Sequence, residues 1–273
     1  MLKAASVLEI VHVATLVHDD ILDNADMRRD KATLHSVFGK QTSILLGDAL
    51  FSFALELATE FSTTRICNIV SRAIRKTCTG EINQNFNKQN YDLSADQYFS
   101  IIQDKTGELF NASCSVGAYL TSADDELITL VGNFGTSLGV NYQIYDDLID
   151  TFGSESSFGK TLGTDFESGK LTLPIIRLLE SLSAEKKKSL KSDLFKNENT
   201  DQFNRYLADL FIEYDIHHVC FSELEKRLVN SKSIASSIPD SNLSSILVAF
   251  LSTFDNKLTK LSLNLVPNFL AIP

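Results

Sequence analysis

The sequence predicts an all-α protein, a single bundle of long helices, and three observations support this prediction. Apolar residues recur with the period of a helix along most of the chain, and no segment alternates convincingly with a period of two. The 273 residues include only four prolines and twelve glycines, and none cluster into a linker, which indicates a single domain over residues 1–273. Hydrophobic residues make up 44% of the chain, which is enough for a sizeable core.

The first helices follow from apolar stripes. Apolar positions at i, i+3 and i+4 predict a helix over residues 1–25. The polar run that follows predicts a loop over residues 24–36. Residues 41–60 are apolar almost all round, which predicts a buried helix. Capping and first-turn signals begin three further helices, at residues 62–87, 94–119 and 124–152.

The second half of the chain begins with an expected loop. Residues 153–171 hold four glycines and no apolar period, and a helix connection of this length is usually functional or disordered. Weaker helical patterns follow at residues 172–182, 184–195, 199–213, 217–236 and 240–262.

Composition narrows the class of protein. The net charge is −10, and nonspecific binding to nucleic acid requires a basic face, so we expect no nucleic-acid partner. No stretch reads as long and apolar enough to cross a membrane, and no signal peptide is recognisable, so we expect no transmembrane segment and a cytoplasmic location. The cysteines show no paired spacing and predict buried thiols in a reducing compartment: Cys67, Cys78, Cys114 and Cys220.

Two acidic triads are candidates for chemistry. Asp19, Asp20 and Asp23 have the spacing i, i+1, i+4, which places the first and last on one helix face. A lone triad of this kind is more often a solvated helix end than a cation site. The same spacing recurs at Asp146, Asp147 and Asp150.

Both triads come near the expected C-terminal end of a long helix, where their charges oppose the helix dipole. Because both placements are unfavourable for stability, they suggest that bound cations offset the negative charges. Mg²⁺ prefers oxygen ligands, and it is commonly held by one or two carboxylates together with substrate phosphates. If the two helices face each other, the cations could grip a diphosphate between them.

Basic residues stand next to these acids. Arg28 and Arg29 follow the first triad, Lys105-Thr106 interrupts an apolar helical stretch, and the glycine-rich loop carries Lys160 and Lys170. Arginine offers a planar fork for phosphate and lysine a point charge. Each is more often a surface charge when taken alone, but together they are suited to binding phosphorylated substrates.

Several segments, in this order, resemble the motif series of the trans-isoprenyl diphosphate synthases: HDDILDNADMRRDKATLH, DKTGE, NYQIYDDLID, FGKTLGTD and SGKLTLP. The ordered set is specific, and the resemblance extends over residues 1 to about 180. It implies helices around a deep central cavity, usually in a homodimer. It also implies head-to-tail condensation of isopentenyl diphosphate onto an allylic diphosphate, farnesyl or geranylgeranyl diphosphate.

The resemblance also implies roles for individual residues. Mg²⁺ would be held on the allylic diphosphate by Asp19, Asp20, Asp23, Asp146, Asp147 and Asp150. The same diphosphate would contact Arg28, Lys105, Lys160 and Lys170. Thr106 and Gln143 would lie beside the allylic substrate, along the developing carbocation, and His12 and Arg29 would bind isopentenyl diphosphate. The residues expected to be catalytic are Asp19, Asp20, Asp23, Lys105, Thr106, Gln143 and Asp146. His18 and His35 are expected to make local hydrogen bonds only.

Product length depends on the helix that precedes the first triad. Ala14 and Thr15 are small and would leave a tunnel open one turn before the acids, and in the resembling family this goes with longer products. Phe51, Phe53 and Phe61 could form a lower floor, although each is more often ordinary core. We therefore expect a product longer than geranylgeranyl diphosphate, such as a quinone side chain, with a shorter-chain synthase as the alternative.

The sequence departs from the resembling family at its beginning. The family normally starts with helices that carry a GGKRxRP motif for isopentenyl diphosphate, and this chain lacks the motif, so we expect an N-terminally short domain. A shortened sequence, a subunit completed by a partner and a chain that no longer turns over are the open explanations. A non-catalytic or partner-dependent subunit of a heteromeric synthase is thus an alternative function. QIYDDLID argues against a terpene cyclase, whose second metal site has a different pattern.

Overall fold

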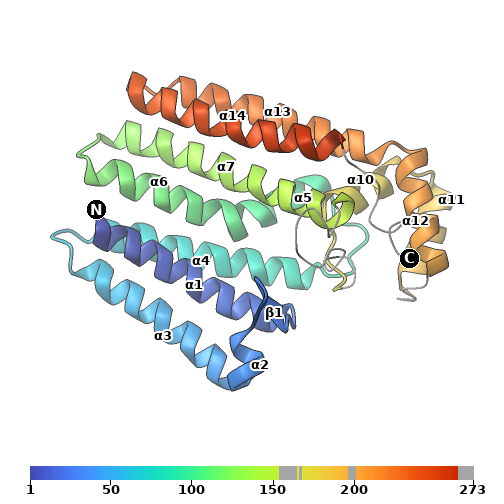
Figure 1. Cartoon of the computed structure of the whole chain (residues 1–273), viewed down its shortest axis with the longest axis horizontal. Coiled ribbons are helices and arrows are strands. Elements are labelled where there is room, and N and C mark those ends of the chain that lie inside the picture. Colours follow the sequence, from blue (N-terminus) through green and yellow to red (C-terminus); the bar gives the residue numbers. More distant parts are fainter. Residues whose placement is uncertain (154–164, 166–167, 196–200, 264–273) are drawn as a thin grey trace. The chain divides into compact units, whose positions relative to one another are not determined.

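Long helices joined by short connections make up the part of the chain that the computed structural model describes, residues 1–153, 165, 168–195 and 201–263 (Figure 1). The predicted all-α class is confirmed. The chain divides into two compact units: unit 1 comprises Met1–Thr79 and Asp104–Gly139, and unit 2 comprises Gly80–Gln103 and Val140–Pro273. Each unit is described by itself.

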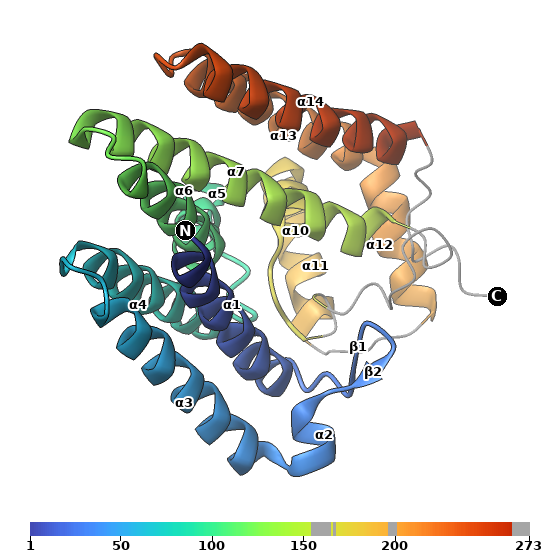
Figure 2. The same cartoon turned by 60° about the vertical axis from the view of Figure 1, so that its left-hand side comes forward.

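The core of unit 1 forms where α1 (Leu2–Leu22) packs along α3 (Lys40–Thr59), and the two helices run side by side in both views (Figures 1 and 2). The stripe predicted for the first helix supplies one side of this core. The buried cluster consists of Ala4, Val7, Val11, Ala54, Ala58, Ile66, Val70 and Val116. Small residues at several of these positions let the helix axes approach closely.

The segment between α1 and α3 is more ordered than the loop predicted for residues 24–36. Two short strands, β1 (Met27–Arg28) and β2 (Lys31–Ala32), pair antiparallel, and α2 (Leu34–Phe38) follows (Figure 2). The two turn residues, Arg29 and Asp30, both have positive φ, the backbone that a two-residue hairpin of type I′ requires. Strands of two residues are too short to show a period of two in the sequence.

α3 corrects two expectations. It was predicted to be buried, but Ile44, Leu45, Leu46 and Phe53 are exposed along it, with Leu45 68% exposed. Among the described helices, α3 is also the one that is long and apolar enough to cross a membrane, so the expectation that no segment meets this criterion was wrong. Core helices of soluble proteins meet the same criterion. A helix that is apolar all round is expected to be shielded from water, but its composition does not tell whether the same chain, a partner or a membrane shields it.

A π-helical turn divides the helix predicted over residues 94–119. α4 (Arg65–Phe86) is followed by α5 (Ala95–Ile102), the π-helix η1 (Gln103–Gly107) and α6 (Glu108–Leu120). Periodicity cannot reveal one wider turn inside an apolar helix. Such turns frequently mark functional sites.

Glycines bring α7 (Asp125–Phe152) close to α6 within unit 1. A Cβ on Gly135 would lie 2.5 Å from the carbonyl oxygen of Phe110, and one on Gly139 would lie 2.9 Å from the Cα of Gly107. Real Cβ contacts are longer, so a larger residue at either position would push α6 away from α7. This close approach also holds the end of the π-helix against α7.

Unit 2 contains the helices predicted for the second half of the chain. They are α10 (Leu173–Ser181), α11 (Ala184–Phe195), α12 (Asp201–Glu213), α13 (Ile216–Ser236) and α14 (Ser241–Leu263). α13 and α14 lie side by side, joined by an ion pair of 2.7 Å between Lys232 and Asp255 (Figure 1). Asn141 of α7 donates a hydrogen bond of 2.8 Å to Ser231 of α13. These five helical predictions are confirmed.

The four cysteines all lie within the described residues, and all are free thiols. Cys220 is buried, but Cys78 is exposed and the other two are half-buried, so the expectation that all four are buried was wrong. Cys78 lies on an exposed side of α4.

Candidate functional site

Both acidic triads lie at the C-terminal end of a long helix, as predicted. Asp19 and Asp20 belong to the last turn of α1, and Asp23 is its C-terminal cap. The second triad occupies the last two turns of α7. Neither helix has a basic residue in its last turn, so the acids oppose the helix dipole without compensation from within the helix. The first triad belongs to unit 1 and the second to unit 2, and their facing each other stays a prediction.

The donor set is suited to hard cations. Each triad offers only carboxylate oxygens, the ligands that Mg²⁺ prefers. Over the residues that the structure describes, no three His, Cys, Asp or Glu side chains are placed to hold a metal ion by themselves. Mg²⁺ sites in enzymes of phosphorylated substrates commonly draw on the substrate's own oxygens, so a triad need not supply a full set of ligands.

One face of α1 carries the predicted residues of unit 1. His12, Thr15, Asp19 and Asp23 follow one another at spacings of three and four along a continuous helix, so they share a face. The first three are half-buried and Asp23 is exposed. Sequence spacing therefore placed His12, expected to bind isopentenyl diphosphate, on the same side of the helix as the acids.

Asp20 turns away from that face and holds an arginine. Its side chain is buried, and its Oδ1 accepts a hydrogen bond of 2.6 Å from Nε of Arg28 in β1. The hairpin of β1 and β2 thus brings the positively charged side chain of Arg28 back to the C-terminal end of α1, where the acids lie. Arg29 lies at the tip of this hairpin and is exposed.

Asp147 is the most enclosed acid of the second triad. It is only 3% exposed, and both its oxygens accept hydrogen bonds: Oδ2 from the hydroxyl of Tyr98 at 2.6 Å and Oδ1 from Nε2 of Gln143 at 2.8 Å. Burial, and then the charge of Asp165, raise the pKa of Asp147 to about 8, while the two donated hydrogen bonds act in the opposite direction. Asp146 is half-buried.

Asp150 organises the segment that precedes α10. Its Oδ2 accepts a hydrogen bond of 3.2 Å from the backbone N–H of Asp165, whose own carboxylate lies 3.4 Å from Nζ of Lys170. Lys170 is buried, and its backbone N–H donates to the carbonyl of Asp165 at 2.9 Å. Lys170, which is expected to bind the allylic diphosphate, is therefore linked to Asp150 of the second triad by way of Asp165. Lys160, expected to have the same role, lies outside the described residues.

Lys105 and Thr106 both lie on the π-helix and are half-buried. Their neighbour Asp104 forms an ion pair of 2.9 Å with Lys76 of α4, which ties the π-helix to unit 1. The wide turn explains how a lysine and a threonine interrupt the apolar pattern here: it redirects these side chains relative to a regular helix.

The two histidines expected to make local hydrogen bonds each contact a backbone carbonyl, and Nε2 of His18 also lies 3.6 Å from Oδ1 of Asp48 in α3. Nε2 of His18 lies 3.2 Å from the carbonyl of Ile44, and its ring meets Phe51 edge-on. Nε2 of His35 lies 2.9 Å from the carbonyl of Ala25. Both side chains join α1 and its following segment to neighbouring elements.

The predicted chain-length residues differ in their surroundings. Ala14 is fully buried, whereas Thr15 is half-buried on the face of Asp19, and its hydroxyl donates to the carbonyl of His12 at 2.7 Å. Phe51 and Phe61 pack against the core cluster. Phe53 is 47% exposed on the outward side of α3, which removes it from the expected floor of a tunnel.

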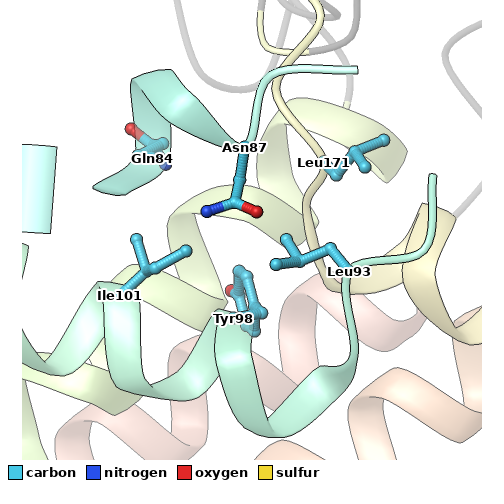
Figure 3. A pocket seen from close by; sticks show the side chains of 6 residues that line it. All are labelled: Gln84, Asn87, Leu93, Tyr98, Ile101 and Leu171. Carbon is cyan, nitrogen blue, oxygen red and sulfur yellow. The ribbon is translucent and has the colours of Figure 1, made fainter. Parts of the chain in front are cut away.

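Two residues near the second triad were missed by sequence reasoning. In the sequence, Asp165 stands between Lys160 and Lys170 shortly after the second triad, and that position was a usable signal. Tyr98 gave no signal, because it reads as one apolar residue of a helix. Its ring lines a small pocket within unit 2 (Figure 3), together with Gln84, Asn87, Leu93, Ile101 and Leu171.

Comparisons with known proteins agree with the resemblance. The profile of the polyprenyl synthetase family matches residues 1–210. A short chain isoprenyl diphosphate synthase from Methanocaldococcus jannaschii is 34% identical over 70% of this chain and 59% of its own. Heptaprenyl diphosphate synthase component 2 from Geobacillus stearothermophilus is 35% identical over 66% of this chain and 56% of its own. The chain thus spans less than two thirds of these relatives.

Solved structures show the same fold. A decaprenyl diphosphate synthase from Rhodobacter capsulatus superposes with a TM-score of 0.86 and 26% identity, over 94% of this chain and 79% of its own. A polyprenyl synthase from Caulobacter crescentus CB15, solved with calcium and isoprenyl diphosphate, gives a TM-score of 0.82 and 30% identity over 91% and 76%. With its two triads at the ends of α1 and α7 and a family profile that matches most of its length, the chain belongs to the polyprenyl synthetase family, the trans-isoprenyl diphosphate synthases.

Proposed function

We propose that this chain is a Mg²⁺-dependent prenyltransferase that condenses isopentenyl diphosphate head-to-tail onto an allylic diphosphate. The observation that carries the proposal is the repeated acidic triad, placed each time at the C-terminal end of a long helix in a member of this family. Acids in that position lower stability unless cations offset them.

The residues present suit magnesium and diphosphate. Asp19, Asp23 and Asp146 present carboxylates that are not fully buried, so they would be first to meet a cation. The relative from Caulobacter crescentus was solved with calcium, another hard cation, and with isoprenyl diphosphate. Bound Mg²⁺ would neutralise charge on the leaving diphosphate.

The proposed reaction needs no protein nucleophile. The allylic carbon–oxygen bond breaks, and diphosphate departs with the electron pair. The double bond of isopentenyl diphosphate attacks the cation, a new carbon–carbon bond forms, and a proton is lost to the departing diphosphate. In this scheme Arg28, Lys105 and Lys170 balance the diphosphate charge, and Lys160 is expected to join them. Fixed dipoles of Thr106 and Gln143 stabilise the carbocation, and His12 and Arg29 hold isopentenyl diphosphate.

The proposed product is longer than geranylgeranyl diphosphate and would serve as a quinone side chain. The names of the similar proteins range from short chain to decaprenyl, so they do not select a length. Support comes from α1 itself, where Thr15 is small and lies on the face of Asp19. A shorter-chain synthase is the alternative.

The test is an extension assay. Purified chain is incubated with Mg²⁺, farnesyl diphosphate and labelled isopentenyl diphosphate, and the extracted products are sized. We expect a ladder that ends beyond geranylgeranyl diphosphate, with no product when the metal is chelated. Cyclised hydrocarbon released without isopentenyl diphosphate would contradict the proposal. The absence of incorporation by a chain that still binds Mg²⁺ and farnesyl diphosphate would favour a partner-dependent subunit.

We also propose that the enzyme works as an assembly in which a second copy of this chain covers the outward side of α3. Large apolar side chains gathered on an exposed surface mark sites of protein–protein contact, and α3 exposes four of them: Ile44, Leu45, Leu46 and Phe53. The name of one relative, component 2 of a heptaprenyl diphosphate synthase, supports the alternative of a different partner chain.

Leu45→Glu should break this assembly. A charge placed in an apolar interface would be buried without a partner, so we expect self-association to weaken by about tenfold or more. Light scattering after size exclusion measures the mass. Val229→Glu is the matched control, because Val229 of α13 is equally exposed, at 67% against 68%. A monomeric parent chain that is fully active would overturn the proposal, and a parent chain that gains activity only with another subunit would replace it with the heteromer.

A further inference from the structure

We propose that Asp147 acts as a positioning residue: together with Tyr98 it orients the side-chain amide of Gln143. This inference rests on the proposed function, in which Gln143 stabilises the allylic carbocation. It distinguishes Asp147, which is enclosed by protein donors, from its neighbour Asp146, which is half-buried.

The hydrogen bonds of Asp147 carry the inference. Each of its two oxygens accepts one bond from a protein donor, at 2.6 Å from Tyr98 and 2.8 Å from Gln143. The side chain is almost completely enclosed, at 3% exposure. A cation at Asp147 would have to compete with both donors in a space closed to solvent. Asp146, the next residue along, is half-buried and has no such enclosure.

Tyr98 is rigidly held, which makes it a suitable anchor. It is 2% exposed and lies in the first turns of α5, a helix that begins with a capping box between Ser94 and Gln97. Its ring forms part of the pocket wall in Figure 3, between Leu93 and Ile101. Its hydroxyl therefore has one well-defined partner across unit 2, the carboxylate of Asp147.

The hydrogen bond to Asp147 fixes the orientation of the side-chain amide of Gln143. Because Oδ1 of Asp147 accepts this hydrogen bond, it selects the NH₂ end of the amide and prevents the amide from rotating by half a turn. The carbonyl end, which carries partial negative charge, then has a fixed direction. A fixed negative dipole end stabilises a developing cation without the cost of reorientation during the reaction.

The first triad repeats the arrangement. Its middle acid, Asp20, is also buried and bound to a protein side chain, Arg28, whereas Asp19 is half-buried and Asp23 exposed. In both triads the middle acid is thus buried and accepts a hydrogen bond from a protein side chain, while the first acid is half-buried.

The test compares Asp147→Asn with Asp146→Asn. Mn²⁺ replaces Mg²⁺, and its binding is counted by electron paramagnetic resonance in the presence of an unreactive allylic thiolodiphosphate. We expect Asp146→Asn to weaken Mn²⁺ binding by about tenfold or more, since even residues that only support a metal ligand commonly cost that much. Asp147→Asn should leave Mn²⁺ binding within about twofold of the parent chain. Equal weakening in the two variants would overturn the proposal.

Tyr98→Phe tests the positioning itself, because it removes one hydroxyl and keeps the ring. We expect kcat to fall by about tenfold, because the amide of Gln143 loses its fixed direction, with KM for farnesyl diphosphate unchanged. In a Gln143→Ala background, Tyr98→Phe should have no further effect on kcat, since its effect passes through Gln143. A merely structural tyrosine would lower kcat equally in both backgrounds.

The two proposals fail in distinguishable ways. If the parent chain binds neither Mn²⁺ nor the thiolodiphosphate, the proposed function is wrong. If it binds both, and Asp147→Asn loses them as Asp146→Asn does, only the positioning role is wrong. Thermal unfolding of each variant confirms that the chain under test is folded.

Discussion

Asp23→Asn is expected to lower kcat/KM for chain extension by about 10²- to 10³-fold. Asp23 caps α1, is exposed, and shares a helix face with Asp19. Asparagine keeps the size of the side chain and removes the charge that would hold Mg²⁺ on the diphosphate. Because the residue is exposed, the free energy of unfolding should change by less than about 0.5 kcal/mol. Initial rates over a series of Mg²⁺ concentrations measure the effect.

Asp30→Asn is the control for charge alone. Asp30 is also exposed, lies at the tip of the hairpin that follows α1, and has a positive φ that asparagine tolerates. We expect its rate to stay within about threefold of the parent chain, since a distant exposed charge is screened by solvent. If the two variants behave alike, Asp23 has no specific role in binding a cation.

Thr15→Phe is expected to convert a long-chain synthase into one that stops at farnesyl or geranylgeranyl diphosphate. Thr15 lies one turn before Asp19 on the same face of α1 and is half-buried. A phenylalanine there would stand where the growing chain is proposed to pass, and the chain cannot displace a packed ring without strain. Product sizes from the extension assay, with farnesyl diphosphate as primer, measure the change.

Two neighbouring positions make this test specific. Val13→Phe adds the same ring to the exposed side of α1 and should leave product length unchanged. Ala14→Phe places the ring in a fully buried position, so we expect it to lower the free energy of unfolding by about 1–3 kcal/mol. Long products from Thr15→Phe would show that the growing chain follows another path.

Most of the helices were predictable because their signals are local. A period of 3.6, the cap at Ser94 and the acids at the start of α7 depend on residues within a few turns of one another. The same holds for the spacing within each triad. The short hairpin and the π-helix were missed because each changes only a few backbone angles inside a segment whose polarity pattern still fits the simpler element.

The division of labour within the triads could not be read from spacing. Asp146 and Asp147 are adjacent and chemically identical, yet one is half-buried and the other is enclosed by Tyr98, 49 residues away in the chain. The pairing of Asp20 with Arg28 likewise depends on a hairpin that returns the arginine to the helix end. Tertiary packing decides which residues become partners of this kind, and the sequence of one helix does not show how that helix packs.

The sequence by itself determined the all-α class, the positions of the acidic triads and the family, because helical period and ordered motifs are properties of neighbouring residues. The tertiary structure alone decided that Asp20 and Asp147 are bound by protein side chains, and which side of α3 stays exposed. The physical reason is the same in both cases. Burial depends on which distant segments pack against a side chain. The type of a residue and its position in the sequence do not specify those segments.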